Sequence, residues 1–195
     1  MKNEWYMLWR CILANLLYYS AKEKTRRAIN SDIDRYLEHE KVDANNKKRS
    51  AQLDYLLLSG EPSFRSVFYY RLKARKISCA ICRIFLPSIK EIEIYGKIDG
   101  GLYLSHNYMV VHPHSAGNNL RVDAGVVIGV NNGQFPTIGN NVCVGANSTV
   151  IGGINIGDNV IIEPGSVVTK SLESNAVYGG NPAVFIRNIN VQEEA

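Results

Sequence analysis

An apolar residue returns at every sixth position over much of the second half of the chain. One register contains Ile98, Leu104, Val110, Ala116, Val122 and Ile128, and a second contains Ile138, Val144, Val150, Ile156, Ile162 and Val168. A period of six fits neither the helical repeat of about 3.6 residues nor the two-residue alternation of a strand. It is typical of a parallel β-helix, in which three hexapeptides form one coil of a triangular prism. We expect the apolar residue of each repeat to point into the prism and Asn or Gly to supply left-handed backbone at its corners.

The charge distribution divides the chain into two parts. Residues 1–90 contain 18 Lys and Arg against 9 Asp and Glu, whereas residues 91–195 contain 4 against 9. We therefore predict an α + β protein with a helical domain at 1–88, a β-helix of about five coils with a C-terminal cap at 89–187, and a tail at 188–195. The basic part is expected to be a solvated helical face. Its alternative partners are nucleic acid, an acidic membrane surface and an anionic, lipid-carried substrate at the membrane, but no nucleic-acid motif accompanies the charge.

Four helices are expected in the first part. The first would be amphipathic, and its apolar face would contain Trp5, Leu8, Trp9, Ile12, Leu13, Leu16 and Tyr19. We expect this face to pack against other helices, and burial in a membrane interface is the alternative. A second helix would start at Ser31 as N-cap, a third would carry Leu53 and Leu56 to Leu58, and a last long one would run from Ser63 to Phe85.

Cysteine usage and hydropathy suggest the compartment. Cys11, Cys79, Cys82 and Cys143 are too unevenly placed for a disulfide framework, and we expect all four to be reduced thiols. Arg10 interrupts the apolar N-terminus, no cleavage site follows it, and no uncharged run of about 18 residues exists. The chain is thus expected to be cytoplasmic, without an integral membrane segment.

The hexapeptide rhythm breaks once. Ten residues separate Ile128 from Ile138, so the segment 130–137 holds four more residues than a repeat needs. Insertions of this kind project as loops and often carry function. Asn131, Asn132 and Gln134 would offer hydrogen-bonding groups there, and Phe135 an apolar wall.

Three histidines lie close together at the start of the prism. His106 and His112 are six residues apart and would share a phase on successive faces, whereas His114 would point toward the interior. One chain cannot bring these three onto one ion, so no metal site is predicted. His106 is expected to face outward at a corner, where a neutral imidazole can remove a proton from a hydroxyl.

Several segments of the prism resemble the serine acetyltransferase branch of the hexapeptide acyltransferases. They are residues 97–106 (KIDGGLYLSH), 138–146 (IGNNVCVGA), 164–170 (PGSVVTK) and 179–183 (GGNPA). The resemblance implies a left-handed β-helix and acetyl-CoA as donor. Flat prism faces with regular apolar content pack well around a three-fold axis, so a homotrimer is expected, with a hexamer of two trimers as the alternative. The resemblance also implies that His106 is the general base and that Glu91 orients it, with Asp99 as the second candidate for the orienting carboxylate. Coenzyme A would lie near Gly129, Ala146, Pro164 and Lys170.

Departures from that branch concern the acceptor. The amino-acid enzymes carry an aspartate before the histidine and an Arg-His pair in the loop, where this chain has Ser105, Gln134 and Phe135. A site without these charges is expected to bind a zwitterion poorly. A saccharide hydroxyl in capsule or surface-polysaccharide synthesis is therefore the expected acceptor. Serine acetylation for cysteine biosynthesis and a non-catalytic trimeric scaffold are the alternatives.

Overall fold

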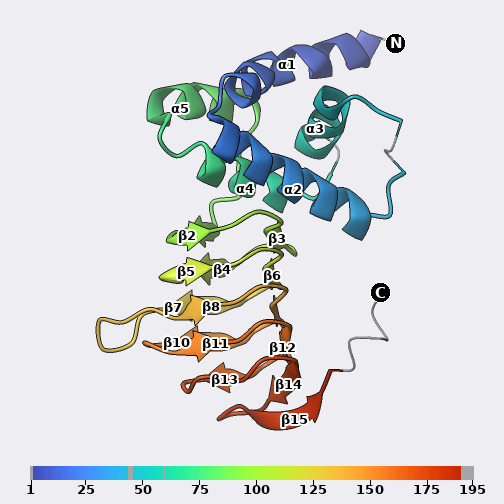
Figure 1. The fold of residues 1–195 in the computed structure, drawn as a ribbon. Coiled ribbons are helices and arrows are strands. Elements are labelled where there is room, and N and C mark those ends of the chain that lie inside the picture. Colours follow the sequence, from blue (N-terminus) through green and yellow to red (C-terminus); the bar gives the residue numbers. More distant parts are fainter. Residues whose placement is uncertain (1, 44–45, 59, 190–195) are drawn as a thin grey trace.

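The computed structural model describes residues 2–43, 46–58 and 60–189, with side chains from residue 10 onward. Five helices form one end of the molecule and a stack of short strands forms the rest (Figure 1). The helices are α1 (Lys2–Tyr19), α2 (Glu23–His39), α3 (Arg49–Leu58), α4 (Ser63–Arg71) and α5 (Lys76–Phe85). No described helix is long and apolar enough to cross a membrane.

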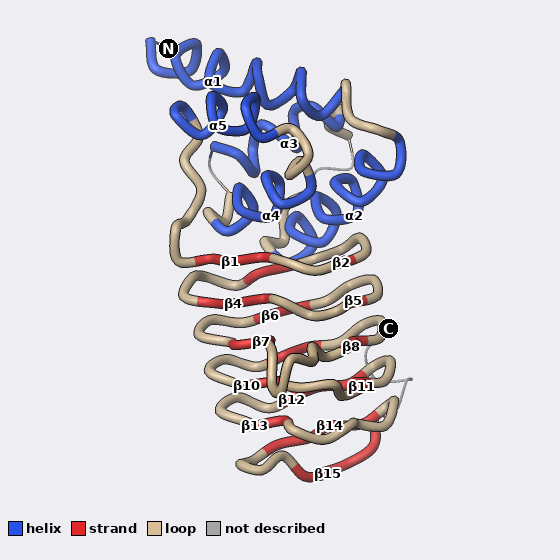
Figure 2. Tube along the Cα trace, turned by 90° about the vertical axis from the view of Figure 1, so that its left-hand side faces the viewer, coloured by secondary structure: helices blue, strands red, loops and turns tan. Residues whose placement is uncertain are grey.

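The strands form a parallel β-helix with three sheets, as Figure 2 shows. Sheet A contains β1 (Ile92–Ile94), β4 (Met109–Val111), β7 (Val127–Gly129), β10 (Thr149–Ile151) and β13 (Val167–Val168). Sheet B contains β2 (Lys97–Ile98), β5 (Ser115–Ala116), β8 (Thr137–Ile138) and β11 (Asn155–Ile156). Sheet C contains β3 (Tyr103–Leu104), β6 (Arg121–Val122), β9 (Cys143–Val144), β12 (Val160–Ile162), β14 (Ala176–Gly179) and β15 (Val184–Asn188). The predicted fold class is confirmed, and the antiparallel β15 closes the C-terminal end.

The apolar registers form the core of the prism with one exception. Every residue of the two predicted registers is buried except Val110, whose neighbours Met109 and Val111 point inward instead. Val111 pairs with Ile128 and is the true inward position of that coil. The prediction for Val110 was wrong because the corner before β4 contains one residue more than the hexapeptide repeat, and the next corner one fewer.

Asparagines form a ladder at the corner between sheets B and C. The amide of Asn119 donates to Asn141 at 2.9 Å, Asn141 donates to Asn159 at 2.9 Å, and Asn159 donates to Asn175 at 2.7 Å. All four residues have φ between 54° and 61°. Asparagine fits here because it tolerates left-handed backbone and its side chain can both donate and accept.

The helical domain differs from its prediction in three respects. Helix α1 buries Cys11, Ala14, Leu17 and Tyr18, and exposes Ile12, Leu16 and Tyr19. The small residues let α1 approach α3 and α5 closely, so the bulkier stripe is left outside. The side chains of Trp5, Leu8 and Trp9 lie outside the described part. Ser31 lies inside α2 rather than at its start, and the chain between Ser63 and Phe85 forms two helices with a break at residues 72–75.

Side chains of the helical domain hydrogen-bond the open edge of the first coil. The Leu104 amide donates to the Tyr36 hydroxyl at 3.1 Å, and the Leu102 amide donates to Asp32 at 2.8 Å. Arg71 donates to Asp32 at 2.7 Å and to the carbonyl of Asp99 at 2.7 Å. Without these partners the edge would present unpaired backbone groups. The helices therefore cap the prism and fix the position of its first corner.

Candidate active site

His106 lies at the corner between sheets C and A, where the chain leaves β3 and enters β4. Its φ is 69°, and that of Tyr108 is 58°. Elsewhere in the described prism, the residues with positive φ are asparagines or glycines. Left-handed backbone costs an ordinary L-residue roughly 1–2 kcal/mol. The corner thus keeps a histidine where the fold favours asparagine or glycine, and strain of this kind clusters at functional sites.

The imidazole of His106 faces solvent beside a carboxylate from the helical domain. Its side chain is 71% exposed, and Nδ1 lies 4.0 Å from Glu61 Oε1. Glu61 is held in turn, because its amide donates to Glu40 Oε1 at 2.7 Å and the Tyr55 hydroxyl donates to Glu40 Oε2 at 3.1 Å. The Glu61 distance is that of an ion pair when the imidazole is protonated, and it is too long for a hydrogen bond. Glu61 can therefore stabilise an imidazolium at this corner.

The other residues predicted to act with His106 lie at different places in the first coil. Glu91 is exposed directly before β1, and its carbonyl accepts the Met109 amide at 3.0 Å, so it lies one rung above the same corner. Ser105 is half-buried, with its amide donating to Val122. Asp99 lies at the corner between sheets B and C, at the other end of the segment that leads through β3 to His106. Among the described residues, the carboxylate within ion-pair distance of His106 is that of Glu61 rather than that of Glu91 or Asp99.

The outer surface of sheet C continues from this corner. His39 of α2 stacks on Tyr103 with ring centroids 4.1 Å apart, and partial burial lowers the pKa of His39. Below Tyr103, the Arg121 guanidinium pairs with Asp123 at 3.0 Å. Burial raises the pKa of the Cys143 thiol, so this thiol is not activated as a nucleophile. His39 and His106 are both exposed, but one face of the His39 ring is covered by Tyr103.

The inserted segment forms a small hairpin between β7 and β8, which projects from the prism (Figure 1). The Asn131 amide donates to the Gln134 carbonyl at 3.0 Å, and the Gln134 amide donates back at 3.1 Å. Asn132 and Gly133 have φ of 51° and 73°. Two residues with positive φ between paired positions form the type I′ turn that Asn-Gly favours. The exposed amides of Asn131, Asn132 and Gln134 are thus presented by an ordered turn.

Three aromatic side chains form a column along the corner between sheets A and B. His112 lies between Tyr95 and Phe135, with centroid distances of 4.8 Å and 4.3 Å. His114 is exposed and not inward as predicted, and the neighbouring Pro113 is buried instead, because the corner after β4 has one residue fewer than the repeat. No group of three or more His, Cys, Asp or Glu side chains in the described part is arranged to hold a metal ion. Phe135 packs against His112 at this corner, and its predicted role as an apolar wall for a substrate stays a prediction.

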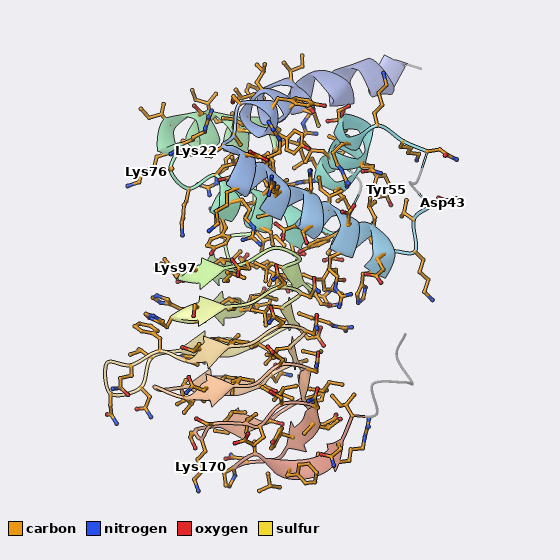
Figure 3. All side chains as sticks on the ribbon, viewed as in Figure 1. Lys22, Asp43, Tyr55, Lys76, Lys97 and Lys170 are labelled. Carbon is orange, nitrogen blue, oxygen red and sulfur yellow. The ribbon has the colours of Figure 1, made fainter. Side chains whose placement is uncertain are left out.

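The residues predicted to contact coenzyme A occupy two different corners. Ala146 and Pro164 lie in the connections that follow β9 and β12, in the same column as His106. Gly129 and Lys170 lie at the corner of the hairpin and aromatic column, and Lys170 is exposed near the far end of the prism (Figure 3). Sheet A separates the two columns. Pro164 is three rungs below His106, or about 14 Å at the usual strand spacing.

Two features of this region escaped the sequence analysis. Glu61 comes from a Gly-Glu-Pro turn whose only visible role was to end a helix, and its contact with His106 joins positions 45 residues apart. The aromatic column could not be predicted without knowing the actual register of β4. A period marks inward positions, but it gives no information on which outward residues of successive coils meet.

The fold and the corner site define a class: a parallel β-helix of hexapeptide repeats with a helical N-terminal cap. Residues 135–170 match the family described as bacterial transferase hexapeptide (six repeats). The predicted resemblance to the hexapeptide acyltransferases is confirmed, and residues 135–170 carry that family's repeat.

Relatives of known activity are named acetyltransferases. Serine acetyltransferase 2 of Arabidopsis thaliana is 30% identical over 129 residues, which cover 62% of this chain and 40% of that protein. Galactoside O-acetyltransferase of Escherichia coli (strain K12) is 34% identical over 113 residues, covering 50% and 56%. The chain thus spans about half the length of these relatives. The fold is that of the serine acetyltransferase of Neisseria gonorrhoeae, with a TM-score of 0.66, 23% identity, and coverage of 89% of this chain and 70% of that one.

Proposed function

We propose that the chain is an acetyl-CoA-dependent O-acetyltransferase that acetylates a saccharide hydroxyl in capsule or surface-polysaccharide synthesis, a reaction of the cytoplasm. The observation that carries this proposal is His106, an exposed imidazole kept in left-handed backbone at a corner with an extra residue, beside the carboxylate of Glu61. The named activities of the relatives supply the reaction type.

In the proposed reaction His106 takes the proton of the acceptor hydroxyl as its oxygen attacks the thioester carbonyl. Glu61 stabilises the imidazolium that forms, with Glu91 one rung above as the partner that the resemblance implies. A main-chain N–H donates to the oxyanion. The carbon–sulfur bond then breaks, the acetyl ester remains on the acceptor, and His106 returns the proton to the sulfur of coenzyme A.

We further propose that the working unit is a homotrimer, with two trimers able to form a hexamer. His106, Ala146 and Pro164 lie on one corner of the prism, whereas Gly129, Phe135 and Lys170 lie on another, at the opposite end of the sheet A strands. The two columns of one chain cannot enclose a single substrate. A neighbouring copy that packs against sheet A would bring its hairpin corner to the first copy's His106 corner, with coenzyme A along the groove.

The acceptor assignment rests on the neutral residues of the site. Ser105, Gln134 and Phe135 offer no charge to the carboxylate or ammonium of serine, and an aromatic wall flanked by amides suits a sugar ring. The relatives include one named for each acceptor, so serine is the second candidate.

Steady-state acetyl-CoA turnover with L-serine, nucleotide sugars and oligosaccharides as acceptors tests the assignment. We expect kcat/KM for the best saccharide to exceed that for serine by at least about a hundredfold, which corresponds to two lost charge-assisted bonds. Efficient turnover at low millimolar serine would overturn the saccharide assignment. If none of the acceptors supports turnover and acetyl-CoA causes no thermal shift, the non-catalytic scaffold is favoured instead.

A further inference from the structure

A large open hollow lies where the helical domain meets the first coil, on the side away from the His106 corner. Its volume is about 610 Å³. Helix α4 separates the two places, because Ser63 at its start donates to the Leu104 carbonyl and Arg71 at its end donates to Asp99. The charged residues that line the hollow are Lys22, Lys24, Arg27, Arg71, Lys73, Lys97 and Asp99. Lys22 and Lys97 lie on the same side of the molecule in Figure 3.

Most of these cations have no carboxylate partner. Arg71 is buried and satisfied by Asp32, and Arg27 pairs with Glu23. Within the described part, none of the four lysines forms an ion pair, and each of them is exposed. Ammonium groups around one hollow repel each other and raise its potential. A bound polyanion would remove that repulsion.

A second hollow of about 470 Å³ adjoins the first, and Tyr70 and Lys73 line both. It adds Lys76 and Arg83 of α5 and the ring of Tyr95, the first member of the aromatic column. Its lining includes no carboxylate. Ser66 also lines it, 93% buried, with a hydroxyl that has no hydrogen-bond partner among the described residues. The two adjoining hollows, which we call the junction groove, therefore share Tyr70 and Lys73 and together present cations and an aromatic ring, with the Ser66 hydroxyl buried in their wall.

We infer that this junction groove binds a diphosphate-bearing ligand, with the diphosphate between Lys73 and Lys97 and the attached ring toward Tyr95. Lysine ammonium groups bind phosphate oxygens as point charges, and the number of cations exceeds what one carboxylate or monophosphate would neutralise. The inference rests on the proposed function in one respect: the ligand would be the activated form of the saccharide acceptor.

Two sources share this chemistry, a soluble nucleotide diphosphate sugar and a lipid-linked diphosphate sugar. A lipid source is compatible with α5, because Ile77 and Ile84 on this helix are 80% and 75% exposed near Lys76. The proposal concerns the diphosphate, and the experiment separates the two sources.

Calorimetric titration of the full chain with inorganic pyrophosphate and with a uridine diphosphate sugar tests the groove. Co-sedimentation with phosphatidylcholine vesicles that contain a polyprenyl diphosphate sugar tests the lipid source. We expect Lys73→Gln with Lys97→Gln to weaken pyrophosphate binding at least about tenfold, the value of one lost charge-assisted bond. Lys97→Arg should retain binding. The matched control is Lys47→Gln, an exposed lysine between α2 and α3 that lines neither hollow.

The outcomes are distinct. Tight binding of the uridine diphosphate sugar alone, or of the vesicles with the polyprenyl diphosphate sugar alone, supports diphosphate binding in the groove and identifies the source. No binding of any diphosphate probe, equal affinity of the double variant and the wild type, or equal binding to phosphatidylglycerol vesicles would overturn it. Diphosphate binding without acetyl transfer to any acceptor would overturn the proposed function and leave the groove. Acetyl transfer to free saccharides without diphosphate binding would overturn the proposed ligand of the groove and leave the proposed function.

Discussion

The carboxylate beside His106 is the residue whose role most needs a direct test. Glu61 is the recorded ion-pair partner, whereas the resemblance implies Glu91. We expect Glu61→Gln to lower kcat roughly tenfold, about 1.4 kcal/mol of barrier, with KM little changed, because it removes charge that acts as the imidazolium forms. Glu91→Gln, measured in parallel with the same acceptor, should lose less. A larger loss of kcat for Glu91→Gln would show that the residue implied by the resemblance is the orienting one.

Tyr108 provides a test of backbone strain that does not involve the imidazole. It is 67% exposed with φ of 58°, so its side chain contributes little packing to offset an unfavourable backbone. We expect Tyr108→Asn to stabilise the fold by about 0.5–1 kcal/mol, measured by urea unfolding. Asn147→Tyr at the equivalent left-handed position two coils below is the matched control and should destabilise by a similar amount. Destabilisation by Tyr108→Asn would mean that the corner is not strained.

At the scale of elements, one buried ion pair lies at the contact between the helical domain and the first coil. The side chains of Arg71 and Asp32 are 5% and 1% exposed. Asp32→Ala should destabilise the chain by about 3–5 kcal/mol in urea unfolding, because it leaves the guanidinium buried without a partner. Asp34→Ala, which removes a pair whose side chains are 62% and 33% exposed, should cost no more than about 1 kcal/mol. Equal losses would contradict the role of Asp32 in the cap.

The sequence predicted some elements better than others, for physical reasons. The hexapeptide period identified the prism because each repeat contributes one residue to a continuous core, so a single pattern recurs along the whole stack. Helix α1 was placed with the wrong face inward, since a periodic apolar stripe does not reveal whether a neighbouring helix needs bulk or the small side chains of Cys11 and Ala14. Two inward positions were misassigned, Val110 and His114, and both follow the corner that contains one residue more than the repeat. That corner is also the candidate active site, and departures from a local sequence rule are expected at functional sites.

At the scale of the whole molecule, sheet A carries the proposed subunit contact. Its outward row includes Val110, Val127 and Val167, and Val127 is 39% exposed. Sedimentation equilibrium should give about three times the chain mass of 21.8 kDa, or a doubled trimer. Val127→Asp should dissociate the assembly and abolish transfer, because it buries a carboxylate at the contact. Val184→Asp on β15 is the control and should leave the assembly intact. An active monomer would contradict the shared site.

The account as a whole depends on proton removal by His106. The most direct measurement is the rate of acetyl ester formation from acetyl-CoA on the best saccharide acceptor, compared between the wild type and His106→Asn. Asparagine suits the left-handed corner, so the variant should melt no lower than the wild type while its rate falls about 10²–10⁴-fold. A folded His106→Asn variant that transfers acetyl at the wild-type rate would contradict the account.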